Sequence, residues 1–273
     1  MGRVIAPAPV GLYSISVRGL EVPALLSWAA RHRIPFIHLR GGRRGCDLAA
    51  QDATTLARWR EASACTVPVT GVTADTDLAD LLSADPAVRR QAREEVCRLA
   101  DAARVLGAAW LRLLARRPLH TTLAGDCSGP LDGHVLAVPL LIELHAPQWL
   151  TSRPHAALVR LLQQQPRLRL LADSAQFAQA LADPGDDRAA ERLEQLGPWI
   201  EVLHLSDPGP GLSDPSHAVV ADHAIRRIAA GQRIEVAVEW TGVDRTRAAA
   251  LARYHEHAAW WRWRNAAHLE ASS

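Results

Sequence analysis

Four short apolar segments, each carrying a side chain that can bind a metal ion, recur along the second half of the chain. They run over residues 140–145, 170–173, 202–207 and 236–239 and contain Glu143, Asp173, His204 and Glu239. These side chains follow one another at intervals of 30, 31 and 35 residues (143 to 173, 173 to 204, 204 to 239). Such an interval accommodates one strand, one helix and two loops, so each segment can close one βα unit of a parallel barrel. In that fold the four side chains would converge at one mouth.

The rest of the chain alternates strand and helix patterns in the same way. Strand patterns precede the four segments at residues 10–17, 34–39, 66–72 and 110–114. Helix patterns fill the intervals at residues 22–31, 48–61, 86–107, 149–162, 177–196, 218–230 and 245–267. Residues 116–136 are crowded with Pro, Gly, Asp and Ser, so the fourth helix is expected to be short or missing. The series predicts an α/β fold, a (β/α)8 TIM barrel that forms one domain over residues 1–273.

Alternation along the strands indicates which side chains face the barrel axis. In the fifth strand the alternate apolar residues suit the helix layer, which leaves Glu143 and His145 pointing inward. The same alternation turns Asp173, His204 and Glu239 inward on the three strands that follow. Active sites of this architecture lie at the carboxyl ends of the strands, where these residues fall.

Composition argues against several classes of protein. Hydrophobic residues make up 48% of the chain and charged residues 22%, as in a globular protein with a large core. The formal charge is +2, from 31 basic and 29 acidic residues, so a broad phosphate-binding surface for nucleic acid is disfavoured. Every basic residue is Arg, which excludes Schiff-base and lysine-base mechanisms.

Cysteine use and apolar runs bear on location. Cys46, Cys65, Cys97 and Cys127 form no CxxC pair, which is typical of thiols in a reducing cytosol. The amino terminus shows no secretory pattern, and no apolar run approaches the length of a membrane span. We therefore expect a cytoplasmic protein that does not enter a membrane.

Four motifs resemble those of the xylose isomerase-like TIM barrels, which include sugar phosphate isomerases and epimerases and, more distantly, apurinic endonucleases. In order and spacing they are Ile142-Glu143-Leu144-His145, Asp173-Ser174-Ala175-Gln176, His204-Leu205-Ser206-Asp207 and Val238-Glu239. The resemblance covers residues 10–242. It implies one divalent metal bound by Glu143, Asp173, His204 and Glu239. It also implies that the two glutamates form the acid–base pair on opposite faces of the substrate.

The chemistry of this ligand set is independently sensible. Three carboxylates and one imidazole suit Mn²⁺, Mg²⁺ or Co²⁺, with Zn²⁺ or Fe²⁺ as alternatives. Open coordination positions could take a carbonyl and its neighbouring hydroxyl, which would acidify the adjacent C–H. We expect an isomerase or epimerase that transfers a proton next to a carbonyl of a small polyhydroxylated or anionic metabolite. Alternatives are a metal-dependent lyase, dehydratase or hydrolase of a specialised biosynthetic pathway, and a non-catalytic barrel that binds a ligand or partner.

Further polar residues near the strand ends are candidates for substrate binding. His145 shares the inward face of Glu143, and Gln176 follows Asp173 closely. Asp207 is a candidate too, with orientation of His204 or of a neighbouring loop, and capping, as the alternatives.

The second strand ends in a basic, glycine-rich loop. His38 and Arg40 share a face and precede Gly41-Gly42-Arg43-Arg44-Gly45. Backbone amides and arginine forks suit a phosphate or carboxylate of the substrate, and a solvated loop is the alternative.

Three departures from the family pattern concern the substrate. Epimerases of free ketoses usually carry a His where this chain has Gln176, and a Glu where it has His38. They also carry an Arg soon after the His-x-x-Asp motif, whereas residues 208–217 contain none. A standard hexose is therefore disfavoured. The endonuclease pattern needs further histidines at the ends of the third and fourth strands, and residues 70–74 and 113–117 have none.

The last helix carries a tryptophan cluster, Trp-Trp-Arg-Trp-Arg, at residues 260–264. Helical spacing brings Trp260 and Trp263 onto one side. Packing on the barrel and burial in a homodimer are the leading interpretations, of which we favour the dimer, and stacking on nucleic acid is the weakest.

Overall fold

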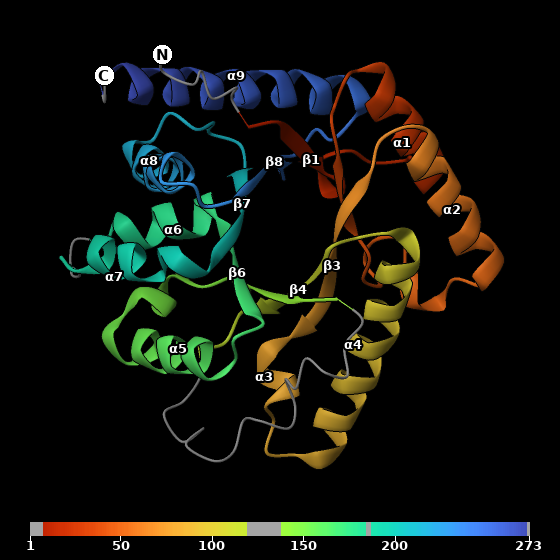
Figure 1. Cartoon of the computed structure of the whole chain (residues 1–273), viewed down its shortest axis with the longest axis horizontal. Helices are drawn as coiled ribbons and strands as arrows, with labels where there is room; N and C mark the ends of the chain where they lie inside the picture. Colours follow the sequence, from red (N-terminus) through yellow and green to blue (C-terminus); the bar gives the residue numbers. More distant parts are fainter. Residues whose placement is uncertain (1–7, 119–137, 184–186, 272–273) are drawn as a thin grey trace.

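Eight parallel strands close into a barrel in sequence order (Figure 1). The computed structural model describes residues 8–118, 138–183 and 187–271. The strands are β1 (Val10–Tyr13), β2 (Ile37–Arg40), β3 (Val69–Asp77), β4 (Trp110–Ala115), β5 (Leu140–Leu144), β6 (Leu168–Asp173), β7 (Ile200–Asp207) and β8 (Glu235–Trp240). Strand β1 pairs with β8, which closes the ring. The prediction of a (β/α)8 TIM barrel is thus confirmed, while its organisation as a single domain stays a prediction.

Helices surround the barrel (Figure 1). They are α1 (Val22–Arg31), α2 (Ala53–Cys65), α3 (Leu78–Leu81), α4 (Pro86–Leu106), α5 (Ser152–Gln164), α6 (Ser174–Leu181), α7 (Ala189–Leu196), α8 (Pro215–Ala229) and α9 (Arg247–Ala271). The helix predicted at 177–196 is two helices, α6 and α7, because Pro184 and Gly185 stand between them in the sequence. The prediction for the fourth helix concerns residues 116–136, most of which lie outside the described residues.

The lower part of the barrel interior is filled with side chains. Four inward residues form an apolar cluster separate from the main core, namely Trp110, Leu141, Leu171 and Val202. The alternate residues of β5 join the main core between strands and helices instead, as strand alternation predicts. A Cβ at Gly71 would lie 2.0 Å from Cζ2 of Trp110, so the indole depends on a glycine beside it. This packed floor leaves the carboxyl ends of the strands as the open side.

The side chain of Ser16 joins the segment that follows β1 to the end of β8. Strand β1 stops at Tyr13, short of the predicted residue 17, because a 3-10 turn (Ser14–Ser16) follows it. Within this turn the buried Ser16 hydroxyl accepts a hydrogen bond from the backbone N–H of Trp240, 2.9 Å away. The turn therefore folds over the end of β8 and forms part of the rim.

The tryptophan cluster lies on α9. Trp261 is fully buried, Trp260 packs partly buried against the core, and Trp263 is 64% exposed. The Arg264 guanidinium lies over the rings of Trp260 and Trp263 and pairs with Asp222 at 2.6 Å. Part of the cluster thus packs on the barrel, and the homodimer stays a prediction.

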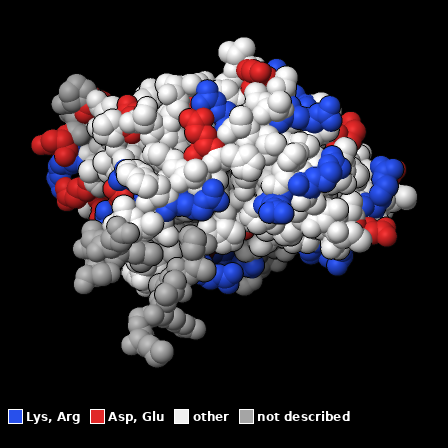
Figure 2. Space-filling model, turned by 90° about the horizontal axis from the view of Figure 1, so that it is seen from above, with Lys and Arg blue, Asp and Glu red and all other residues white. Residues whose placement is uncertain are grey.

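The surface carries both signs of charge. On the face in Figure 2, acidic and basic residues are scattered among a larger uncharged area, as the near-balanced composition predicts. Within the described ranges, no helix has the length and apolar character needed to cross a bilayer. The cytoplasmic location stays a prediction.

Candidate metal centre

A pocket of about 360 Å³ opens at the carboxyl ends of the strands. Glu143 from β5, Asp173 from the end of β6 and Glu239 from β8 all line it. Each of these side chains is at least nine-tenths buried, so their carboxylates are largely withdrawn from bulk water. Three of the four predicted ligands therefore share one pocket at the expected end of the barrel.

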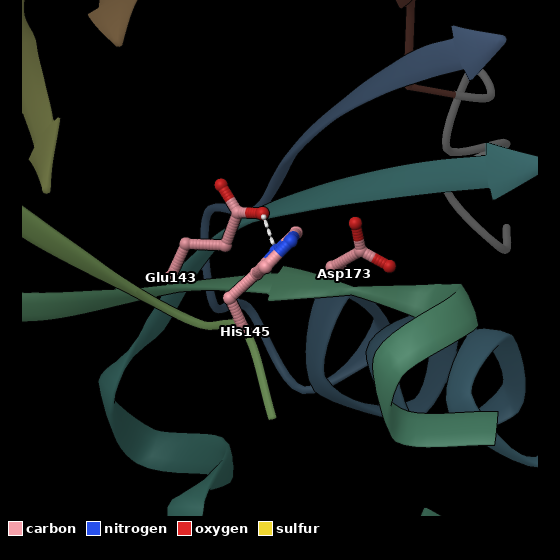
Figure 3. A group of neighbouring side chains, drawn as sticks. All are labelled: Glu143, His145 and Asp173. Atoms are coloured by element: carbon pink, nitrogen blue, oxygen red, sulfur yellow. Dashed lines mark hydrogen bonds and ion pairs between the residues drawn. The ribbon is translucent and has the colours of Figure 1, made fainter. Parts of the chain in front are cut away.

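One group of metal-capable side chains among the described residues combines two predicted ligands with a predicted substrate contact. Ligand atoms of Glu143, His145 and Asp173 all lie within 4.8 Å of one another. Nδ1 of His145 lies 3.1 Å from Oε1 of Glu143, and Figure 3 shows Asp173 beside this pair. His145 directly follows β5 at the rim, where its side chain is 41% exposed. It is therefore placed as an additional donor for a cation at this site.

Glu239 is linked to this group through a serine. The Ser206 hydroxyl oxygen lies 2.8 Å from Oδ2 of Asp173 and 3.0 Å from Oε2 of Glu239. Because a hydroxyl carries one hydrogen, it can donate to only one of the two carboxylates at a time. When both carboxylates are ionised, the cluster therefore holds more acceptors than hydrogens, which a bound cation would balance.

A buried chain of hydrogen bonds reaches His204 from below. Burial lowers the pKa of His38 and of His204 to about 4, so both rings are neutral at pH 7. Glu235 accepts a hydrogen bond from Nε2 of His38 at 3.0 Å and another from Nε1 of Trp110 at 3.2 Å. Nδ1 of His38 is then an acceptor, so Nε2 of His204, 2.8 Å away, is the donor.

Because Nε2 of His204 carries the hydrogen in this series of hydrogen bonds, the other ring nitrogen, Nδ1, has a free lone pair. Nδ1 of His204 lies 2.9 Å from Oε2 of Glu239. A carboxylate and an imidazole lone pair repel each other at this distance unless a proton or a cation relieves the contact. An unprotonated nitrogen fixed by a hydrogen bond on the far side of the ring is the form in which histidine binds metals. The arrangement therefore fits the divalent cation that the motifs imply.

The carboxylates differ strongly in their affinity for protons. Burial and the neighbouring carboxylates raise the pKa of Asp173 and of Glu239 to about 7. Burial also opposes ionisation of Glu143, but the Arg112 guanidinium, the hydrogen bond with His145 and the nearby histidines together outweigh it and lower the pKa to about 2. Glu143 is thus the permanent anion of the cluster, whereas Asp173 and Glu239 retain protons near neutral pH until a cation binds.

Arg112 is a site residue that sequence reasoning missed. It is 4% exposed, and its Nε lies 2.6 Å from Oε2 of Glu143. Nη1 donates to the carbonyl of Ala74 at 2.8 Å, and Nη2 lies 3.3 Å from the hydroxyl of Tyr13. The available signal was an arginine inside an apolar strand, in phase with Trp110 on the inward face.

Of the other predicted substrate contacts, two line the pocket and two do not. Arg40 and Gln176 line it, and the backbone N–H of Gln176 donates to Oδ1 of Asp173 at the start of α6. His38 is fully buried beneath His204. Asp207, also fully buried, faces the helix layer, because strand alternation turns it away from the side on which Ser206 points inward.

Asp207 instead holds the turn after β7. One of its carboxylate oxygens accepts hydrogen bonds from the backbone N–H groups of Gly209 and Gly211, at 2.7 and 2.9 Å. The other lies 3.1 Å from Nε2 of His257 on α9. Orientation of a neighbouring loop, the alternative considered for this residue, describes these contacts.

Comparison with solved structures identifies xylose isomerase-like barrels of sugar epimerases as structural neighbours. D-psicose 3-epimerase from Clostridium cellulolyticum H10, solved with D-tagatose, is 12% identical with a TM-score of 0.68, over 93% of this chain and 98% of that one. L-ribulose 3-epimerase is 16% identical with a TM-score of 0.69, over 97% and 98%. A xylose isomerase-like TIM barrel protein from Mycobacterium smegmatis, in complex with magnesium, is 11% identical with a TM-score of 0.60, over 91% and 95%.

At these identities the likeness concerns the fold. No protein-family model matches the sequence, and no curated protein matches it either. The resemblance indicated by the four motifs is therefore confirmed at the level of the barrel, and the chemistry rests on the residues described above.

Metal binding is expected to tighten as the pH rises from about 6 to about 8. The protons that Asp173 and Glu239 hold with a pKa of about 7 have to leave before these carboxylates can bind a cation. His204 is already neutral in this range. Below pH 7 the affinity should therefore rise about tenfold per pH unit for each proton released. Calorimetric titration with Mn²⁺ in two buffers of different ionisation enthalpy measures the affinity and the number of protons released. A Mn²⁺ affinity that does not change with pH, without proton release, would contradict the prediction that Asp173 and Glu239 are metal ligands.

Proposed function

We propose that the protein is a divalent-metal-dependent isomerase or epimerase that moves a proton next to a carbonyl of a small metabolite. The observation that carries the proposal is the gathering of Glu143, His145 and Asp173 within 4.8 Å, beside Glu239 and the lone pair of His204. Neighbours of the same fold, a D-psicose 3-epimerase and an L-ribulose 3-epimerase, support it.

The proposed ligands are Glu143, Asp173, His204 and Glu239, with His145 as an additional donor. Their mostly oxygen donor set favours Mn²⁺, Mg²⁺ or Co²⁺, with Zn²⁺ or Fe²⁺ as alternatives. When bound, such a cation supplies Lewis-acid polarisation of a substrate carbonyl and its neighbouring hydroxyl.

The two glutamates are proposed as the acid–base pair, and their environments suit different roles. Glu239, with a pKa of about 7, is matched to gaining and losing a proton near neutral pH. Glu143, ion-paired with Arg112, stays a carboxylate across this range. Carboxyl groups whose pKa values are driven apart are a recurrent arrangement of acid–base catalysis.

Positioning of substrate and ligands falls to the residues around this pair. Arg40, His145 and Gln176 are the proposed substrate contacts, because they line the pocket beside the carboxylates. His38 is proposed to orient His204 rather than to touch substrate, since it is fully buried and bonded to that ring.

Metal analysis of reconstituted protein tests the proposal. Wild type should retain about one Mn²⁺ per chain after gel filtration, whereas Glu143→Gln and His204→Ala should retain much less. Glu201→Gln, a change at an exposed residue of β7, is the matched control. If wild type and variants contain equally little metal, the active-site proposal fails, and a barrel that only binds a ligand or partner becomes the better interpretation.

Incubation of candidate substrates in deuterated water then identifies the reaction. Deuterium entering at the carbon next to the carbonyl, without change of mass otherwise, supports isomerisation or epimerisation. Loss or gain of water or breakage of the substrate would favour the lyase, dehydratase or hydrolase.

A further inference from the structure

A second cavity adjoins the candidate metal centre. It has a volume of about 390 Å³ and lies between the segment that follows β1, the loop after β2 and Arg245. Ile15, Arg40 and Arg44 line both this cavity and the metal pocket, so the two adjoin each other at these residues. We call this second cavity the arginine cavity.

Positive charge dominates the arginine cavity. Within the part of the chain that the structure describes, its charged lining consists of Arg18, Arg40, Arg44 and Arg245 against Glu21 alone. Arg40 and Arg44 share a single counter-charge, since their guanidinium groups lie 3.7 and 2.8 Å from the same oxygen of Asp75. The shared carboxylate neutralises one of the two arginines and leaves the other uncompensated.

The remaining two arginines have no acidic partner among the described residues. Arg18 is exposed at the edge of the cavity. Arg245 is half-buried, and its Nη1 reaches only the carbonyl of Ile15, at 3.4 Å. Its Nε is buried and lacks a hydrogen-bond partner. A buried guanidinium N–H without an acceptor is costly, and the positive charge of Arg245 favours an anionic group in the cavity that this residue lines.

The charge of the metal pocket also favours an anionic ligand. Its charged lining is balanced, with Arg40, Arg44, Arg112 and Arg116 against Asp75, Glu143, Asp173 and Glu239. A divalent cation would add two positive charges to this balance. The combined cleft would then carry an excess of positive charge, which an uncharged sugar leaves unmatched and an anion neutralises.

We propose that the arginine cavity binds an anionic group of the substrate, a phosphate or a carboxylate, through Arg18, Arg245 and the Arg40–Arg44 pair. This inference rests on the proposed function, because it makes the cavity a part of the substrate site. It gives the substrate class as an anion-bearing metabolite. Guanidinium groups suit this task because their planar forks match the oxygens of both kinds of anion.

Calorimetric titration of the protein with inorganic phosphate and, separately, with succinate tests the proposal at low ionic strength. Wild type should bind at least one of the two, and Arg18→Gln/Arg245→Gln should weaken that binding at least tenfold. Arg60→Gln, at an exposed position of α2 outside the cavity, is the matched control and should bind as wild type does. Tighter binding of phosphate indicates a phosphorylated substrate, and tighter binding of succinate a carboxylated one.

The single variant Arg18→Gln keeps the test decisive if the change at Arg245 disturbs folding, because Arg18 is exposed and should still weaken binding several-fold. Absence of binding to wild type, or equal binding to wild type and both arginine variants, would overturn the proposal. Glu143→Gln separates the two hypotheses, since it should lose the metal and retain the anion. Anion binding without metal binding defeats the proposed function alone, and metal binding without anion binding defeats this inference alone.

Discussion

Replacement of Arg112 by alanine is expected to lower the free energy of unfolding of the metal-free protein by about 3–5 kcal/mol. The guanidinium is 4% exposed and lies 2.6 Å from Oε2 of Glu143, which is itself 2% exposed. Its removal leaves a buried carboxylate with only the partly exposed His145 beside it and takes away the donor to the carbonyl of Ala74. Urea denaturation monitored by circular dichroism in the presence of EDTA measures the loss.

Saturating Mn²⁺ should recover part of the stability lost in Arg112→Ala, because a cation bound by Glu143 replaces the missing positive charge and binds only the folded state. The control is Arg169→Ala, which removes an ion pair with Glu201 at the surface and should cost less than about 1 kcal/mol. A loss in Arg112→Ala no larger than in this control would show that the buried pair does not stabilise the barrel.

Glu239→Gln is expected to slow the exchange of substrate hydrogen with solvent by about 10²–10⁴-fold. The amide keeps the size of the side chain and its place beside Ser206 and His204 but cannot take up or release a proton. Because Glu239 is also a proposed metal ligand, the rate is measured by deuterium incorporation at saturating Mn²⁺, with metal content determined in parallel.

The matched control for this measurement is again Glu201→Gln, which leaves the pocket unchanged and should exchange at the wild-type rate. A Glu239→Gln variant that retains its metal and exchanges at the wild-type rate would remove Glu239 from the acid–base pair and leave it a ligand at most.

The barrel could be predicted because its periodicity is local. A strand buried in a parallel sheet leaves an apolar run, and alternation within that run assigns each side chain to the axis or to the helix layer. That rule placed Glu143 and His204 inward, and Leu141 packs inside the barrel as the rule requires. Applied one residue past Ser206, the same rule turns Asp207 outward, so its place in the helix layer, where it meets His257, could be predicted as to side though not as to partner.

The contacts that set the chemistry of the site were out of reach, because they join strands distant in the sequence. The pair of Arg112 and Glu143 depends on the register between β4 and β5. The sequence does not predict this register, because residues 116–136 between the two strands show no clear helix pattern. Likewise, the bond between His38 and His204 links residues 166 positions apart. A sequence shows that such side chains face the axis but not which of them meet at the same height.

The indole of Trp110 fills the floor of the barrel beside Gly71 and also donates to Glu235, the first member of the chain that ends at His204. Hydrogen bonds on the closed side of the barrel, opposite the substrate pocket, therefore determine which nitrogen of His204 carries the lone pair. Loops around the mouth can change length or sequence to suit a new ligand without disturbing this orientation. The protein thus separates what it recognises, at the rim, from how it holds its imidazole, at the base.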